Sequence, residues 1–143
     1  MKTVITRVSR ASVTVDGQTV GAIGPGYLVL LGIEMGDTKE TVERIARKLL
    51  ALRIFADENG KTNRSLSDVG GSLLLVSQFT LCADTSHGNR PSFTAAAPPE
   101  QARELYEYFI DRCREQVPRV EHGVFGAEMQ VESVNDGPFT ILL

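Results

Sequence analysis

The chain has 143 residues, a length that favours a single domain spanning residues 1–143. Hydrophobic residues make up 42% of the chain and charged residues 23%, as is usual for a soluble globular protein. With 15 basic and 18 acidic residues the net charge is −3, which excludes a strong general attraction for nucleic acid but leaves room for a local basic patch that holds one RNA end.

The N-terminal stretch "MKTVITRVSR" has no apolar core of the kind that a signal peptide needs. No apolar run approaches the roughly 20 residues of a membrane span, so we expect a cytoplasmic protein with no membrane partner. Cys82 and Cys113 are too few for a disulfide framework or a four-ligand zinc site. We therefore expect two reduced thiols, with no bound metal and no cofactor.

The first third of the chain is predicted to form strands. In "ASVTVDGQTVGAIG" the alternating Val13 and Val15 run into Asp16-Gly17, a strong signal for a short hairpin. The continuous apolar run in "GPGYLVLLGI" predicts a strand that is buried on both faces.

The stretch "GDTKETVERIARKLLALRIF" changes to helical periodicity. Its apolar positions fall on one helical face: Val42, Ile45, Ala46, Leu49 and Leu50. Asp37 stands three residues before Glu40, a spacing that resembles a capping box at the start of a helix. The opposite face carries Arg44, Arg47 and Lys48, which we expect to be solvated.

The second half repeats the change from strand to helix. "GGSLLLVSQFTL" predicts a second buried strand, and "ADTSHGNRPSFTAAAPPEQ" is a loop of the length that often carries function. A second helix follows in "PPEQARELYEYFIDRCREQV", with Pro99 near its first turn. Its apolar side consists of Ala102, Leu105, Tyr106, Phe109, Ile110 and Cys113. The chain returns to strands from Val120, which predicts an α/β protein with mixed β-sheets and two main helices.

Three familiar motifs are excluded by their context. The glycines of "GAIGPGYLVLLG" precede strand sequence, whereas a dinucleotide fingerprint opens a helix. "DENGKTNRSLSD" resembles a calcium loop but has its glycine misplaced and Asp68 where a terminal Glu is needed. The chain has only two histidines, His87 and His122, and neither lies in a pattern typical of a Ser-His-Asp triad.

The stretch "VSQFTL" places polar groups at the end of a buried strand, just before the long loop. Ser77 and Thr80 offer hydroxyls and Gln78 offers an amide at a position where side chains and free backbone amides often point into a cleft. Spacing alone is equally compatible with simple polar capping of the strand end.

Three stretches together resemble the D-aminoacyl-tRNA deacylases: "RVSRASVTV", "GGSLLLVSQFTLCADTSHGNRPSF" and "FGAEMQVESVNDGPFT". The resemblance covers nearly the whole chain, and its motifs occur in the same order as in the family. Two departures are small: the family often has Val where Phe139 stands, and Lys or Arg where His87 stands.

This resemblance implies an α/β/β layered fold and a homodimer in which each active site is completed by the partner subunit. It implies that the Gly137-Pro138 peptide is cis and projects into the partner's site. There its carbonyl groups would form a rigid wall that an L side chain strikes and a D side chain avoids. Glycine has no side chain to reject, so glycyl-tRNA is expected to be a poorly excluded substrate.

The implied reaction is hydrolysis of the ester that joins a D-amino acid to the terminal adenosine of tRNA. The backbone amides of Phe79 and Thr80 are candidates for the oxyanion hole. Thr80 is the family's proposed nucleophile, but an unassisted hydroxyl is weak, so we favour a role in holding substrate while the ribose 2′-hydroxyl positions or activates water. Gln78 and Ser77 would shape the pocket.

Two arginines complete the expected site. The resemblance implies that Arg7 braces the Gly-Pro loop, and Arg90 would support the long loop or the tRNA end.

Two other functions stay open. The fold also resembles an editing domain attached to some threonyl-tRNA synthetases, so the protein could bind an RNA end without turnover. A general small-molecule esterase is the weaker alternative, because the triad and the G-x-S-x-G elbow are both missing.

Overall fold

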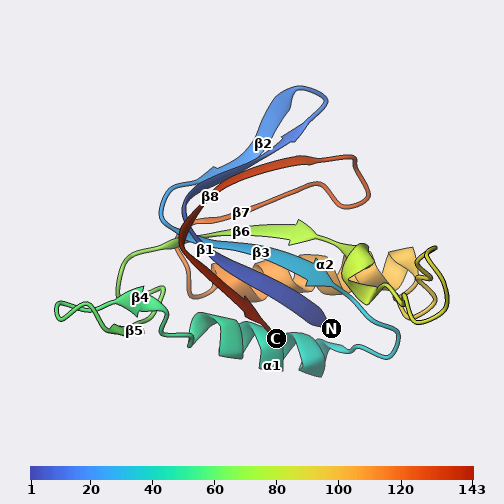
Figure 1. Ribbon diagram of the computed structural model, residues 1–143, viewed down its shortest axis with the longest axis horizontal. Coiled ribbons are helices and arrows are strands. Elements are labelled where there is room, and N and C mark those ends of the chain that lie inside the picture. The colour runs from blue at the N-terminus through green and yellow to red at the C-terminus, as the bar shows by residue number, and fades with distance from the viewer.

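The computed structural model describes residues 1–143 as strands packed against two helices (Figure 1). The strands are β1 (Lys2–Val15), β2 (Gln18–Ile23), β3 (Gly26–Gly32), β4 (Phe55–Ala56), β5 (Thr62–Arg64), β6 (Ser72–Ser77), β7 (Val120–His122) and β8 (Gln130–Leu142). The helices are α1 (Lys39–Leu50), α2 (Pro99–Arg114) and the short 3-10 helix η1 (Phe79–Cys82).

The main sheet is mixed, as expected. Its order is β2-β1-β3-β6-β7, and β8 pairs with the remaining edge of β1. The predicted hairpin joins β1 to β2 in antiparallel register, with Val15 opposite Gln18. The two strands predicted to be buried, β3 and β6, lie side by side in parallel. Most of their residues are buried, as expected for parallel strands that are covered on both faces.

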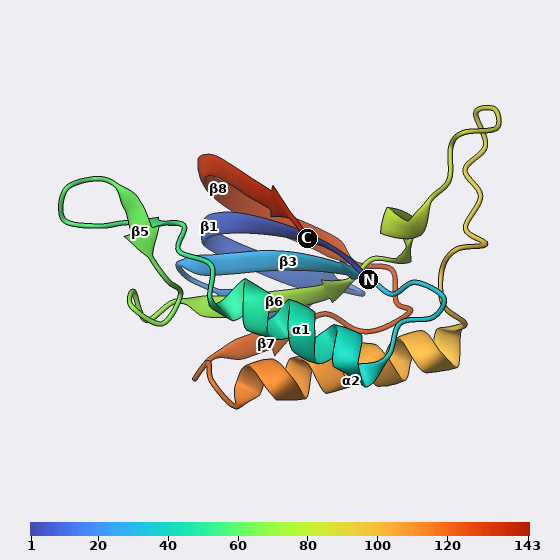
Figure 2. The same cartoon turned by 90° about the horizontal axis from the view of Figure 1, so that it is seen from below.

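The sheet curls until its two ends meet. Arg119, just before β7, donates a hydrogen bond from Nη2 to the Ala22 carbonyl of β2 at 2.8 Å. A cluster of 23 buried residues fills the space between the sheet and the helices, and a separate cluster of 7 fills the concave side of the curl. The result is the α/β/β layering that the resemblance implied, with both helices on one side of the sheet (Figure 2).

Helix α1 forms where the periodicity predicts it, and it buries Val42, Ile45, Ala46 and Leu49. The prediction of an Asp37–Glu40 capping box was wrong. Thr38 is the N-cap, and it exchanges side-chain-to-backbone hydrogen bonds with Thr41. Asp37 is instead buried and accepts hydrogen bonds from the Met1 ammonium and the Glu34 amide.

Helix α2 begins at Pro99 and buries the six residues predicted for its apolar side. Proline fits this first position because the amide that it lacks would have no partner within the helix. Neither helix is long and apolar enough to cross a membrane.

Strand β8 is interrupted where the chain places Asn-Asp-Gly-Pro. Thr140 lies opposite Thr6 and Asn135 lies opposite Val8, so residues 136–139 bulge outward opposite Arg7 alone. We call residues 136–139 the β8 bulge. Within it the Gly137–Pro138 peptide is cis, and Gly137 has φ +137°, a conformation that side chains rarely allow.

Candidate active site

The chain turns sharply where β6 ends. Sequence reasoning placed Phe79 and Thr80 at a strand end, but they form the first turn of η1 instead. The Leu81 amide is the first to donate within this turn, to the Gln78 carbonyl at 3.2 Å. The amides of Phe79 and Thr80 precede it, so they lie ahead of the hydrogen-bond ladder and are available to an outside acceptor.

The turn is seated directly on the end of β3. The Gln78 amide donates to the Leu31 carbonyl at 2.7 Å, and the buried Cys82 thiol donates to the Ile33 carbonyl at 3.5 Å. Between these two bonds lies Gly32. A Cβ added there would stand 2.9 Å from Leu81 Cβ and 3.1 Å from the Gln78 carbonyl oxygen. The bare Cα of Gly32 therefore lets η1 approach the sheet closely.

An apolar pocket of about 490 Å³ opens beside this turn. Ser77 and Gln78 form its polar edge, next to Phe79. The rest of its wall is apolar and comes from β3, β6, α2, the start of β8 and the segments around them: Leu31, Ile33, Val76, Ala96, Ala97, Pro99, Ala102, Phe125, Gly126, Ala127, Met129 and Val131. No ionisable side chain lines the pocket, so the protein offers no general acid or base at this surface.

Thr80 is exposed, and its hydroxyl has one side-chain partner. Gln78 Nε2 donates a short hydrogen bond to Thr80 Oγ1. An amide donor cannot remove the hydroxyl proton, whereas a nucleophilic threonine needs a base in that position. The contact leaves the hydroxyl hydrogen free to be donated elsewhere.

The N-terminal ammonium, just before β1, stabilises the segment that continues from the wall of the pocket. The buried Met1 ammonium donates to Glu34 Oε2 at 2.8 Å and to Asp37 at 2.7 Å. The hydrogen bond from this ammonium holds the pKa of Glu34 below its ordinary value. Next to Glu34, the Ile33 carbonyl accepts from the Ala97 amide at 3.0 Å, and both of these residues line the pocket.

The long loop extends away from the sheet beyond η1, where Figure 2 draws it in yellow. It is fastened near its base by Phe93, whose ring packs edge-on against Phe79 with 5.0 Å between centroids. Arg90 and His87 are exposed in this loop, and neither side chain makes a hydrogen bond or an ion pair. Arg90 thus lies at the same end of the molecule as η1 but outside the pocket.

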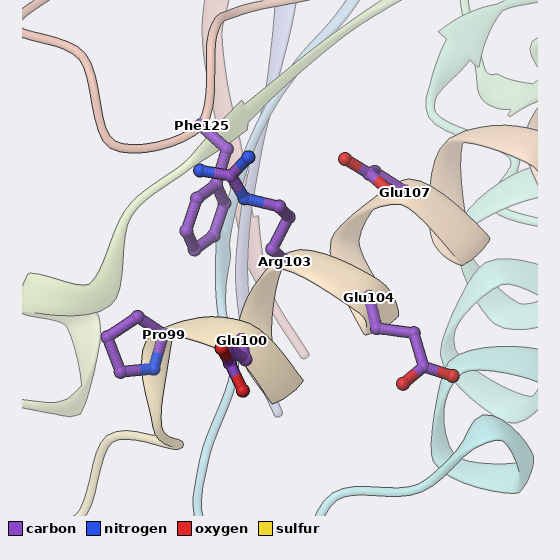
Figure 3. Close-up of a pocket in the computed structure, with 6 residues that line it drawn as sticks. All are labelled: Pro99, Glu100, Arg103, Glu104, Glu107 and Phe125. Atoms are coloured by element: carbon purple, nitrogen blue, oxygen red, sulfur yellow. The ribbon is translucent and has the colours of Figure 1, made fainter.

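A second groove of about 480 Å³ adjoins the pocket and shares Pro99 and Phe125 with it. Figure 3 shows the Arg103 guanidinium lying over the Phe125 ring, 5.3 Å from its centroid. The remaining lining residues are Glu100, Glu104 and Glu107. Their negative charge makes this groove unsuited to phosphate.

The predicted substrate-contacting residues on β1 and β8 lie elsewhere. Arg7 donates from Nε to the Asp136 carbonyl at 2.9 Å, and its guanidinium lies 4.9 Å from the centre of the Phe139 ring. Arg7 therefore holds the β8 bulge. Arg7 stands five residues along β1 from Lys2, which pairs with Gly32 beneath η1, so the bulge is about 16 Å along the strand from the turn.

The structure thus brings Ser77, Gln78, Phe79 and Thr80 together and leaves Gly137, Pro138 and Arg7 at the other end of the same chain (Figure 1). Sequence reasoning missed Gly32, Phe93 and Phe125 as parts of the site. Phe125 lies within "FGAEMQVESVNDGPFT", a stretch that already pointed to function, but nothing in its spacing indicated that its side chain lines the pocket.

The family model described as D-Tyr-tRNA(Tyr) deacylase matches residues 4–143. Over 143 residues the chain is 59% identical to a D-aminoacyl-tRNA deacylase of Variovorax paradoxus (strain S110), with 100% of this chain and 98% of that protein covered. It is 60% identical to a D-aminoacyl-tRNA deacylase of Paracidovorax citrulli (strain AAC00-1), again with 100% of this chain covered and with 92% of that protein.

Two solved structures share the fold. One, named "c-Myc DNA Unwinding Element Binding Protein", has a TM-score of 0.95 and 47% identity and covers 100% of this chain and 97% of its own. The other, a probable eukaryotic D-amino acid tRNA deacylase, has a TM-score of 0.84 over 99% of this chain and 97% of its own. At 18% identity it supports the fold alone.

The curled mixed sheet carries the turn and its apolar pocket in a chain whose relatives are deacylases, so the class is that of hydrolases that act on carboxylic ester bonds. The chain belongs to the D-Tyr-tRNA(Tyr) deacylase family.

Proposed function

We propose that this protein hydrolyses the ester bond of D-aminoacyl-tRNA and releases the free D-amino acid and tRNA. The observation that carries the proposal is the pair of available amides at the start of η1, beside a pocket with no ionisable side chain, in a chain of this family. A tRNA substrate also implies that the protein works in the cytoplasm, where aminoacyl-tRNA is used.

The Phe79 and Thr80 amides would stabilise the reaction's developing charge. Water attacks the ester carbonyl carbon, and the carbonyl oxygen becomes an oxyanion that accepts hydrogen bonds from the two amides. When this intermediate collapses, the bond from carbon to the ribose 3′-oxygen breaks, and the 3′-oxygen takes up the proton that the attacking water gives up. Backbone donors suit this step because η1 is already seated on β3 and needs no rearrangement.

Proton transfer would be assisted by the substrate. With no acid or base in the pocket, the neighbouring ribose 2′-hydroxyl is the group best placed to orient or activate the attacking water. Thr80 then serves as a substrate holder, because Gln78 directs its hydroxyl and no base accompanies it. Ser77 and Gln78 shape the polar edge of the pocket.

Chirality would be read by a second copy of the chain. The β8 bulge lies at the far end of its own subunit, so only a partner can bring Gly137 and Pro138 to η1. Strand β8 supports such a homodimer, because it is exposed along most of its length, leaves one edge unpaired and carries exposed Val131, Val134 and Leu142. Main-chain groups of the bulge would exclude L side chains and tolerate many D side chains.

Glycyl-tRNA would be a substrate as well, because glycine has no side chain for the bulge to exclude.

The test is hydrolysis of D-tyrosyl-, L-tyrosyl- and glycyl-tRNA by the purified protein, with its mass in solution measured by light scattering. We expect rapid release from the D-ester, slower release from the glycyl ester and almost none from the L-ester, by a dimer. Similar rates on the D- and L-esters would refute the chirality proposal. Tight binding of charged tRNA without multiple turnover would instead favour an RNA-end binding module.

A further inference from the structure

The outer face of α1 carries cations that form no salt bridge. Arg44, Arg47 and Lys48 lie on this face, and Arg53 follows just beyond the end of the helix; all four are exposed. We call these four residues the α1 basic surface. None of them forms an ion pair, although many other cations do: Lys2, Arg7, Lys39, Arg64, Arg112, Arg114 and Arg119.

A simple solvated helix face explains only part of this arrangement. Arg47 and Lys48 lie in the last turn, where a cation is favoured by the helix dipole. Arg44 lies earlier in the helix and Arg53 lies beyond it, so the dipole does not account for them. In a chain with more acidic than basic residues, four neighbouring cations that form no salt bridge point to an anionic partner.

The neighbouring helix α2 carries slightly more acidic than basic residues, with Arg103 and Arg114 also exposed. The exposed positions of α2 include Glu100, Glu104, Glu107 and Asp111. The acidic groove of Figure 3 belongs to this surface. An anionic polymer that approaches the helical side of the molecule is therefore disfavoured at this groove and attracted most by the C-terminal half of α1.

The α1 basic surface is connected to the β8 bulge through Ile54 and Arg7. Arg53 is followed by Ile54, whose carbonyl accepts a hydrogen bond from Arg7 Nη1, and Arg7 also holds the bulge at Asp136. Figure 1 shows the end of α1, the β4–β5 hairpin and the bend of β8 at one end of the molecule, with η1 at the other. An aminoacyl end that lies against the bulge would therefore have this basic surface beside it.

We infer that the α1 basic surface binds the phosphate backbone of the tRNA whose aminoacyl end occupies the partner subunit's site. This inference rests on the proposed function and extends it. One subunit supplies the turn at η1, and the other supplies both the bulge and the surface that binds the RNA backbone. Residues three and four apart on a helix are neighbours, so the cations of α1 can contact phosphates of one strand. Such contacts position the RNA and carry no sequence preference, as an enzyme that acts on many different tRNAs requires.

The test compares a double variant with a matched control on two substrates. Arg47→Gln/Lys48→Gln removes two unpaired cations, whereas Lys39→Gln/Arg114→Gln removes two exposed cations that pair with Glu104 and Asp111. Each variant is assayed on D-tyrosyl-tRNA and on the D-tyrosyl 3′-ester of adenosine, which has no phosphate backbone. Both variants keep every residue of the pocket, η1 and the bulge.

We expect kcat/KM of Arg47→Gln/Lys48→Gln on the full tRNA to fall about 10-fold at low salt, mainly through KM, and its dependence on log salt to flatten by about one to two units. Its activity on the adenosine ester, and the control variant on both substrates, should match the wild type. An equal loss on both substrates, an equal loss in the control, or no loss at all would overturn the inference. If the wild type hydrolyses neither D-ester, the proposed function fails and takes the inference with it.

Discussion

The turn at η1 and the β8 bulge differ in how the chain supports them. The turn rests on β3 through two hydrogen bonds and the bare Cα of Gly32, next to the larger buried cluster. The bulge stands on an exposed strand with one free edge, where Arg7 and the partly buried Phe139 hold it. This difference matches the roles proposed for the two elements: a rigid turn inside one chain would suit oxyanion stabilisation, and the exposed bulge would act in a second chain's site.

The strongest test of this comparison lies at the bulge. At Gly137, with φ +137°, an added Cβ would stand 2.9 Å from the Phe139 amide nitrogen. Gly137→Ala should therefore displace the bulge, and we expect kcat/KM on D-tyrosyl-tRNA to fall about 100-fold. Gly60→Ala is the matched control, because Gly60 also has positive φ (+74°) but open space around it. Unchanged turnover of the D-ester by Gly137→Ala would show that the bulge has no part in the site.

The turn can be disturbed in the same way. Gly32→Ala places a Cβ against Leu81 and the Gln78 carbonyl, and so tilts η1 away from β3. We expect kcat to fall about 10-fold while KM changes little, because the amides lose alignment and the pocket remains. Gly24→Ala, with nothing within 4 Å of the added Cβ, is the control. A matching fall in both variants, or a change confined to KM, would contradict the proposed seating role.

Mixing these two variants tests whether one site draws on two chains. A heterodimer of Gly137→Ala and Gly32→Ala subunits contains one site with an intact turn and an intact bulge. Random exchange of subunits in a symmetric dimer should therefore restore about a quarter of the wild-type rate. A mixture no more active than its components would mean that the turn and the bulge of a site come from one chain.

Substitution of Thr80 tests whether this residue is a nucleophile or only holds the substrate. Because its hydroxyl meets only the Gln78 amide, we expect Thr80→Ala to lower kcat less than about 10-fold and to act partly through KM. Single-turnover rates on D-tyrosyl-tRNA separate the two effects. A loss of several orders of magnitude would establish Thr80 as the nucleophile.

The smallest expected effect concerns the brace beneath the pocket wall. Because the Met1 ammonium lowers the pKa of Glu34, this pair stabilises the fold above the ordinary Glu range and loses that contribution as pH falls through the lowered value. Hydrogen bonds from the Met1 ammonium to Asp37 and Glu34 outweigh burial and raise the pKa of this group, so its contribution is lost at alkaline pH. In urea unfolding, the free energy of unfolding should fall by at most about 1 kcal/mol on the acid side from this cause, since Glu34 is partly exposed. Glu34→Gln should flatten that change; an unaltered acid profile would exclude the pair as its cause.

Local pattern predicted much of the fold. The apolar faces of α1 and α2, the hairpin at Asp16-Gly17 and the buried strands follow from periodicity and turn chemistry, because each is determined within a few neighbouring residues. The cap of α1 was mispredicted because Asp37 is captured by Met1, which is remote in sequence. The 3-10 turn at Phe79 was missed for a similar reason, since Gly32 on another strand permits it.

By itself the amino-acid sequence determined the two-helix α/β class and the residue types of the site, together with the resemblance that joins Ser77–Thr80 to Gly137-Pro138. Only the tertiary structure decided that these two segments lie at opposite ends of one chain and that an apolar pocket without ionisable groups opens beside the first. The physical reason is that periodicity records which face of an element is buried. Distances between elements depend on strand register and on how the sheet curls, and each of these is set by contacts between residues far apart in the chain.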